Sequence, residues 1–326
     1  MPVFKKSAEK DVTGMAFFLS LIEKVVQPDC KVRERNLVCL IVIWYDLKVK
    51  LSVLGLFYNT GESENMLEAQ IKVRDLYKIY QIGENREYAL NGISFDVYKG
   101  EFIAIVGTSG SGKSTCLNML AGLEKPSKGS IQIEGKRIDR MSEAELVRFR
   151  RLHVGFIFQS YNLLNSMNAI ENVAMPLMFR GVPEEKRIAE ARKYMKTIGI
   201  SDQEKHMPNQ MSGGQQQRVG IARALVIDPK IIFADEPTGN LDSHTTDDVL
   251  RLMQGIVREQ KKTMIMVTHD PHIAAWSDRQ LRIVDGNIVE TVINPDSEIE
   301  KNIAAANGEP PFAEVTRLED STFQNK

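Results

Sequence analysis

The run Gly107-Thr-Ser-Gly-Ser-Gly-Lys-Ser-Thr115 constrains the fold of this chain more than any other feature. It fits the pattern G-x-x-x-x-G-K-[ST] and directly follows the apolar run Phe102–Val106, which is typical of a buried strand. Glycines let backbone N–H groups turn inward around a phosphate, and the N-terminus of a following helix adds a favourable dipole. The motif therefore predicts an α/β fold with a phosphate-binding loop. The strand-then-helix context argues against a glycine-rich loop that has no ligand.

The side chains of this loop have separate roles in holding a nucleoside triphosphate. Lys113 can reach the β- and γ-phosphates, and the hydroxyl of Ser114 can bind Mg²⁺. The motif alone does not name the class of enzyme, because kinases and GTPases share it. The expected nucleotide contacts in the loop are Gly107, Thr108, Ser109, Gly110, Ser111, Gly112, Lys113, Ser114 and Thr115.

A second apolar run, beginning at Ile231, ends in the acidic pair Asp235 and Glu236. Neighbouring side chains of a strand point to opposite sides, so the two carboxylates face different surroundings. Asp235 is suited to hold the Mg²⁺ shell, and Glu236 is suited to polarise an attacking water as a general base. A lone acidic pair is usually a solvated turn. The phosphate loop upstream favours a hydrolytic site instead.

The segment Met211-Ser-Gly-Gly-Gln-Gln-Gln-Arg218 precedes a helix that we expect to begin near Val219. It resembles the signature of ABC ATPases, Leu-Ser-Gly-Gly-Gln, with methionine in place of leucine. The resemblance implies that Ser212 bonds a γ-phosphate oxygen and that Gly213, Gly214 and Gln215 lie against the nucleotide. It also implies ATP as the ligand and a head-to-tail dimer, in which each signature contacts the nucleotide held by the other subunit. Both a homodimer and a heterodimer with a second ATPase chain fit a single set of motifs.

Further positions match the same family in the same order. The resemblance makes Gln159 a Mg²⁺ ligand that senses the partner, and it places Asp242 in the loop that crosses the dimer interface. It makes His269 the switch histidine that contacts the γ-phosphate. Taken singly, each of these residues would be read as structural.

The resemblance assigns recognition of the adenine base to Tyr80, because the spacing of Lys78-Ile-Tyr-Gln is similar to that of the family. Tyr77 and Tyr88 are alternatives, and any of the three fits a place in the core.

The resemblance covers about residues 68–290 and implies a P-loop NTPase core, an antiparallel β subdomain and a helical subdomain that carries the signature. Residues 66–293 are expected to form the ABC ATPase domain. Local patterns predict a capping box at Ser142 and Glu145, helices over 184–198 and 245–260, and a hairpin turn at Asp285-Gly286. Residues 294–326 are polar and are expected to form a disordered tail.

Residues 1–65 differ from the rest in having no clean helical or strand period. We hypothesise that Met66 is the true start of the protein, and a poorly ordered N-terminal arm is the alternative. The apolar run Leu37–Tyr45 falls far short of the ~20 residues that a membrane span needs.

Composition limits the classes of partner. The chain has 326 residues, a formal net charge of −1 and 26% charged residues, which gives no sequence-wide attraction to nucleic acid. Its three cysteines form no metal-binding spacing, which fits a reducing compartment.

The resemblance implies an ATPase motor that works with an integral-membrane permease on a separate chain, at the cytoplasmic face of the membrane. The runs Phe158–Leu164 and Asn168–Leu177 are similar to the lipoprotein-release and macrolide-export group, which implies export or extraction of a lipophilic or peptide-like cargo. Cell-division and antimicrobial-peptide-resistance relatives look alike. The permease groove is expected near Gln159, Leu163, Leu164 and Met167.

The sequence disfavours two other classes of function, a soluble ABC ATPase that acts on DNA or ribosomes and a scaffold protein. A DNA-repair ABC ATPase would need a long coiled coil between loop and signature, and a translation factor would need two cassettes; this chain has neither. A nucleotide-dependent scaffold with little turnover is disfavoured by the intact Glu236 and His269.

Overall fold

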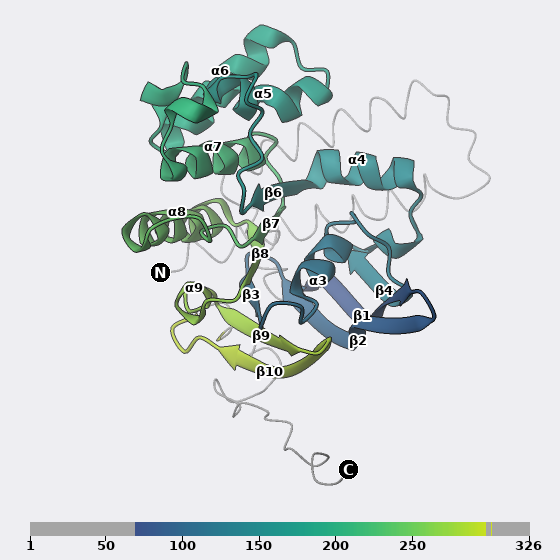
Figure 1. Ribbon diagram of the computed structural model, residues 1–326. Helices are drawn as coiled ribbons and strands as arrows, with labels where there is room; N and C mark the ends of the chain where they lie inside the picture. Colours follow the sequence, from purple (N-terminus) through teal and green to yellow (C-terminus); the bar gives the residue numbers. More distant parts are fainter. Residues whose placement is uncertain (1–68, 298–300, 302–326) are drawn as a thin grey trace, which may run out of the picture. The chain divides into compact units, whose positions relative to one another are not determined.

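The computed structural model describes residues 69–297 and residue 301, which form helices, strands and short connections (Figure 1). The expectations for residues 1–65, including the Met66 start, and for residues 302–326 lie outside the described residues. Within the described part, no helix combines the length and the apolar character that crossing a membrane requires.

A four-stranded antiparallel sheet has the order β2-β1-β4-β5. Val73 on β1 lies opposite Phe95 on one neighbour and Ile131 on the other, and all three side chains are buried. This confirms the antiparallel β subdomain that the resemblance implies. The strands are β1 (Ala69–Ile82), β2 (Asn85–Tyr98), β4 (Lys128–Ile133) and β5 (Lys136–Arg137).

A six-stranded sheet forms the core, in the order β10-β9-β3-β8-β7-β6. All neighbours pair in parallel except β10, which pairs with β9 as an antiparallel hairpin. At its turn Asp285 and Gly286 have φ values of 47° and 74°, the two left-handed residues that a type I′ turn requires. The strands are β3 (Phe102–Val106), β6 (Val154–Phe158), β7 (Ile231–Asp235), β8 (Thr263–Thr268), β9 (Arg279–Val284) and β10 (Asn287–Ile293).

Most of the described helices begin at a residue whose side chain caps them, and α3 and α6 are the exceptions. Ser142 and Glu145 form the predicted capping box at the start of α4. The helices are α3 (Lys113–Leu120), α4 (Glu143–His153), α5 (Ala169–Phe179), α6 (Glu184–Thr197), α7 (Gly213–Leu225), α8 (Ser243–Gln260) and α9 (Pro271–Ala274). Three 3₁₀ turns, η1 (Ile138–Arg140), η2 (Ser201–Gln203) and η3 (Pro208–Gln210), connect them.

The expected start of a helix near Val219 was wrong. Helix α7 already begins at Gly213, because Ser212 caps it by accepting a hydrogen bond from the Gln215 backbone N–H. The Gln215 side chain in turn accepts from the Ser212 N–H, which completes a capping box. The two glycines therefore lie inside the first helical turn.

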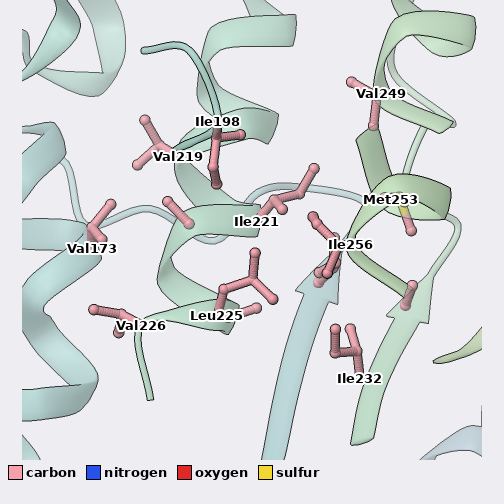
Figure 2. Close-up of a cluster of buried hydrophobic side chains, with 14 of the residues drawn as sticks. Val173, Ile198, Val219, Ile221, Leu225, Val226, Ile232, Val249, Met253 and Ile256 are labelled. Carbon is pink, nitrogen blue, oxygen red and sulfur yellow. The ribbon is translucent and has the colours of Figure 1, made fainter. Parts of the chain in front are cut away.

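The parallel sheet is buried on both faces. Along β3, Phe102 and Ala104 belong to one apolar cluster, and Ile103 and Ile105 belong to the other. Figure 2 shows part of the first cluster, where side chains of α7 and α8 meet β7. Burial on both faces explains why the strands read as continuous apolar runs.

The ends of these strands position the site. The phosphate loop follows β3, Asp235 ends β7, and His269 follows β8. Since the three strands are parallel neighbours, their carboxyl ends meet at one edge of the sheet. At the C-terminal end of the stretch 69–297, Asn294 and Ser297 both hydrogen-bond to Asp278.

Candidate active site

A cavity of about 1000 Å³ lies over this edge of the sheet. Three elements contribute its functional groups: the phosphate loop, β1 with Tyr80, and the residues that follow β7 and β8. The lining residues are Tyr80, Glu87, Ala89, Val106, Gly107, Thr108, Ser109, Gly110, Gly112, Lys113, Ser114, Thr115, Glu236, His269, Pro271, Gln280, Arg282, Val284, Glu290 and Val292.

Two glycines of the loop, Gly107 and Gly112, are required by close packing. A Cβ at Gly107 would lie 2.3 Å from the carbonyl oxygen of Ile283, and one at Gly112 would lie 2.1 Å from that of Ala89. Gly112 has φ 101° and caps α3 without a side-chain hydrogen bond. The N-terminus of α3, with its positive end of the helix dipole, therefore opens onto the cavity, as phosphate binding needs.

Lys113 supplies a buried positive charge. Its side chain is 6% exposed, and Nζ donates a 2.7 Å hydrogen bond to the carbonyl of Thr108 in the same loop. Burial lowers the pKa of the ammonium group, although the carboxylates of Glu236 and Asp235 act in the opposite direction. The hydroxyl of Ser111 is buried and has no hydrogen-bond partner among the described residues. An anion in the loop would satisfy both groups.

Two of the three predicted Mg²⁺ ligands lie together. The hydroxyl Oγ of Ser114 is 3.3 Å from Oδ1 of Asp235. Burial and the neighbouring Glu236 carboxylate raise the pKa of Asp235, against the hydrogen bond from Ser114 and the charge of Lys113. A hydroxyl and a carboxylate are oxygen ligands of the kind that Mg²⁺ takes, so the residues present fit this ion.

Gln159, the third predicted ligand, is not among the residues that line the cavity. Its backbone carbonyl accepts a hydrogen bond from Asn240, and its side-chain amide packs against Gly239, where a Cβ would lie 2.8 Å from Nε2. The structure thus places Gln159 against the loop that follows Glu236.

The predicted base and the predicted switch histidine are in contact. Nδ1 of His269 lies 2.9 Å from Oε1 of Glu236. Glu236 has φ 43°, a left-handed conformation that costs a non-glycine residue about 1–2 kcal/mol. Hydrogen bonds from Glu236 N–H to the Val267 carbonyl, and from Gly239 N–H to the Glu236 carbonyl, hold it there.

Of the three tyrosines considered for base recognition, Tyr80 lines the cavity. Its hydroxyl donates to the Glu124 carboxylate at 2.8 and 3.0 Å, and burial followed by this bond raises the pKa of the phenol. The ring of Tyr77 packs beside Gly92, and Tyr88 is 49% exposed. Tyr80 is therefore the candidate that the structure brings to the phosphate loop.

The signature residues Ser212, Gly213, Gly214 and Gln215 do not line this cavity. Ser212 is the N-cap of α7, and the other three lie in its first turn. Gly213 lies close to Leu241 in the loop before α8, and Gly214 lies close to Thr245 in the first turn of α8. In that loop Asp242 caps α8 by accepting from Thr245. Within a single chain, the phosphate loop and the signature therefore lie apart, although the predicted site contains both.

The cavity also has lining residues that were not predicted from the sequence, among them Glu87 and Ala89 of β2. Gln280, Arg282 and Val284 line it from β9, and Glu290 and Val292 line it from β10. They alternate along the two strands, so each set lies on one face of the hairpin. The alternation of Gln280 and Arg282 with the apolar Leu281 and Ile283 was the signal that could have found the β9 part of this lining.

The profile of the family described as ABC transporter matches residues 90–239. An uncharacterized ABC transporter ATP-binding protein of Thermotoga maritima is 47% identical over 214 residues, which cover 66% of this chain and 91% of that protein. The lipoprotein-releasing system ATP-binding protein LolD of Chromohalobacter salexigens is 44% identical over 223 residues, 68% of this chain and 94% of LolD.

The macrolide export ATP-binding/permease protein MacB of Shewanella sp. is 45% identical over 241 residues, 74% of this chain but 36% of MacB. A solved dimer of the ATP-binding cassette MJ0796, in a post-hydrolysis state with ADP and Pi, superposes with a TM-score of 0.65. It is 38% identical and covers 69% of this chain and 98% of the cassette. The phosphate loop, the Glu236–His269 pair and these relatives lead to one conclusion: the chain belongs to the ABC transporter family, as an ATP-binding subunit with ATPase activity.

Proposed function

We propose that this chain is the motor subunit of an ABC exporter that works as a head-to-tail homodimer. The main support is that the signature, Ser212–Gln215, lies outside the cavity that the phosphate loop of the same chain lines. A second copy would bring its signature to that cavity and complete two equivalent sites. The dimeric MJ0796 cassette, bound to ADP and Pi, supports this arrangement.

The residues of one cavity have distinct tasks in the proposed reaction. Loop N–H groups and Lys113 hold the phosphates, and Tyr80 stacks on the base. Ser114 and Asp235 would hold Mg²⁺, which neutralises phosphate charge when bound, and Gln159 would join them on dimer closure. Glu236 accepts a proton from the attacking water, and His269 fixes the carboxylate and reaches towards the γ-phosphate.

The direction of transport and the partner come from the relatives. LolD is by name the ATP-binding protein of a lipoprotein-releasing system, and MacB is by name an ATP-binding and permease protein for macrolide export. We therefore assign this chain a separate permease, a lipophilic or peptide-like cargo and a place at the cytoplasmic face of the membrane. The chain spans about a third of MacB, so MacB's own activity is not carried over whole.

The permease would contact the connection between β6 and α5. Leu164 there is 42% exposed, and Leu163 and Met167 are partly buried. Gln159 is the first residue of the same connection and contacts the loop after Glu236. A permease bound here would therefore be linked through Gln159 to the loop that follows the proposed base.

The substitution Glu236→Gln tests this function. We expect the purified variant to bind ATP with the affinity of the parent, to lose turnover, and to form an ATP-dependent dimer in size-exclusion chromatography with light scattering. Glu190→Gln, on the exposed face of α6, is the matched control and should hydrolyse ATP normally. Unchanged hydrolysis by Glu236→Gln would remove Glu236 as the base, and a variant that stays monomeric with ATP would remove the homodimer.

A further inference from the structure

Helix α7 carries two buried polar side chains that the proposed reaction does not use. It packs against α5 and α6 on one side and against β6 and α8 on the other (Figure 1). Gln217 is 0% exposed and Arg223 is 7% exposed. Buried polar groups are costly unless they are bonded, so the partners of these two side chains show what they stabilise.

Gln217 holds the chain directly after the proposed base. Its Nε2 donates a hydrogen bond to the carbonyl of Pro237. Its Oε1 has no partner among the described residues, so the bond to Pro237 is what fixes this amide. Glu236, the preceding residue, is in the left-handed conformation; its backbone is held by bonds to Val267 and Gly239, and its carboxylate contacts His269.

Arg223 holds the chain just after Gln159. Its Nη1 donates to the carbonyl of Asn162 at 2.5 Å and its Nη2 to the carbonyl of Tyr161 at 2.6 Å. Both of these residues are left-handed, with φ 50° and 58°. The planar fork of a guanidinium matches two neighbouring oxygens, which an ammonium group does not.

The surroundings of Arg223 make this arrangement unusual. Burial lowers the pKa of its guanidinium to about 10, and no carboxylate in the part of the chain that the structure describes pairs with it. A buried cation held only by carbonyl oxygens is an expensive way to stabilise a core. Its geometry serves the turn after Gln159 instead.

We propose that α7 is a common support for the two functional loops, with Gln217 as the positioning residue for Glu236 and Arg223 as the positioning residue for the turn after Gln159. The support itself follows from contacts within one chain. One consequence rests on the proposed function. Because the signature lies at the first turn of α7, a nucleotide bound by the partner copy would affect the positions of both loops through this helix.

Gln217→Met tests the first contact, because methionine keeps the length of the side chain and removes the donor. We expect amide hydrogen exchange of residues 236–241, measured without nucleotide, to rise above that of the parent. We expect kcat for ATP to fall ~10- to 100-fold with little change in KM, since a small displacement of the base acts on the chemical step. Gln254→Met is the matched control, because Gln254 Nε2 also donates to a backbone carbonyl, that of Trp276 in a different region.

Gln217→Glu gives a readout that general destabilisation does not give. A carboxylate cannot donate to the Pro237 carbonyl, whereas a protonated carboxyl can, and burial favours the protonated form. The activity of this variant, relative to the parent, should therefore recover as pH falls. Activity that is reduced at every pH, in a profile that runs parallel to that of the parent, would contradict the role of the donor.

Arg223→Met and Arg223→Lys test the second contact. Exchange of residues 160–164 should rise most in the methionine variant and less in the lysine variant, which can still reach one carbonyl. Arg180→Met is the matched control, because Arg180 also donates only to backbone carbonyls, those of Arg151, Leu152 and Ile227.

The outcomes separate this inference from the proposed function. If exchange of neither loop rises beyond that in the matched controls, α7 is ordinary core and the inference fails, whatever the ATPase activity. If the parent protein hydrolyses no ATP, the proposed function fails, and the exchange data still decide whether α7 supports the loops.

Discussion

Nδ1 of His269 lies 2.9 Å from Oε1 of Glu236, and the two residues follow neighbouring parallel strands, β8 and β7. The contact joins residues 33 positions apart in the chain through the geometry of the sheet. It orients the carboxylate at the wall of the cavity that the phosphate loop also lines. An oriented carboxylate is what a general base needs before a water can be activated.

His269→Ala should therefore act on turnover and not on binding. We expect kcat to fall ~100- to 10,000-fold, the usual range for loss of a positioned acid–base element, with the affinity for ATP changed only a few-fold. Steady-state ATPase assays and equilibrium ATP titration measure the two quantities. His272→Ala, three residues on and exposed, serves as the control. A loss of affinity as large as the loss of turnover would place His269 in binding instead.

Asp139 gives a prediction about pH and stability. Its side chain accepts hydrogen bonds from Arg137 and from the backbone N–H of Ile131 on β4. Burial alone would raise its pKa, but these bonds outweigh burial and lower it. A carboxyl whose pKa is lower in the folded state stabilises the protein at pH values above its unfolded-state pKa, about 3.9. This stabilisation is lost as the pH falls through the folded-state pKa.

Asp139→Asn should accordingly cost about 1.5–3 kcal/mol of unfolding free energy at neutral pH, the range for hydrogen bonds to a charged group. The difference from the parent should shrink as the pH is lowered below ~4. Urea unfolding of both proteins at several pH values checks this. A cost that stays constant down to acid pH would mean that the charge of Asp139 is not involved.

Much of the fold and of the site could be predicted because the signals are local. The phosphate loop, the acidic pair after β7 and the type I′ turn each occupy one continuous stretch. Tyr80 and Glu124 are 44 positions apart, and Arg223 and Tyr161 are 62 positions apart. No local sequence pattern can predict either contact. The predicted start of α7 near Val219 was wrong because the Ser212–Gln215 capping box begins the helix at Gly213.

Tyr80 should contribute to binding of the adenine base and not to binding of the phosphates. Tyr80→Ala should weaken ATP binding by ~5- to 150-fold, corresponding to about 1–3 kcal/mol of stacking on an aromatic ring. Binding of inorganic tripolyphosphate should not change, because the phosphate loop is intact. Tyr80→Phe keeps the ring and loses only the bond to Glu124, so it should stay near the parent. Tyr88→Ala, outside the cavity, is the control; equal losses in both alanine variants would speak against stacking on Tyr80.

Ser212 has two roles that the right substitutions separate. It caps α7, and in the proposed dimer it meets the phosphate held by the partner copy. Loss of a cap costs ~1 kcal/mol on replacement by alanine, whereas aspartate caps a helix as well as serine does. Ser212→Asp should therefore keep the stability of the parent and bring a negative charge to the partner's nucleotide.

In the Glu236→Gln background we expect Ser212→Asp to leave the affinity of each subunit for ATP unchanged, because Ser212 does not line the cavity of its own chain. We expect the same substitution to abolish the ATP-dependent dimer. Ser142→Ala removes the equivalent capping hydroxyl of α4 and controls for cap loss, so its dimer should persist. Titration of ATP and light scattering measure the two properties separately. If Ser212→Asp still dimerises with ATP as the parent does, the signature does not meet a nucleotide across the interface, because a carboxylate against a γ-phosphate in a closed site would repel it.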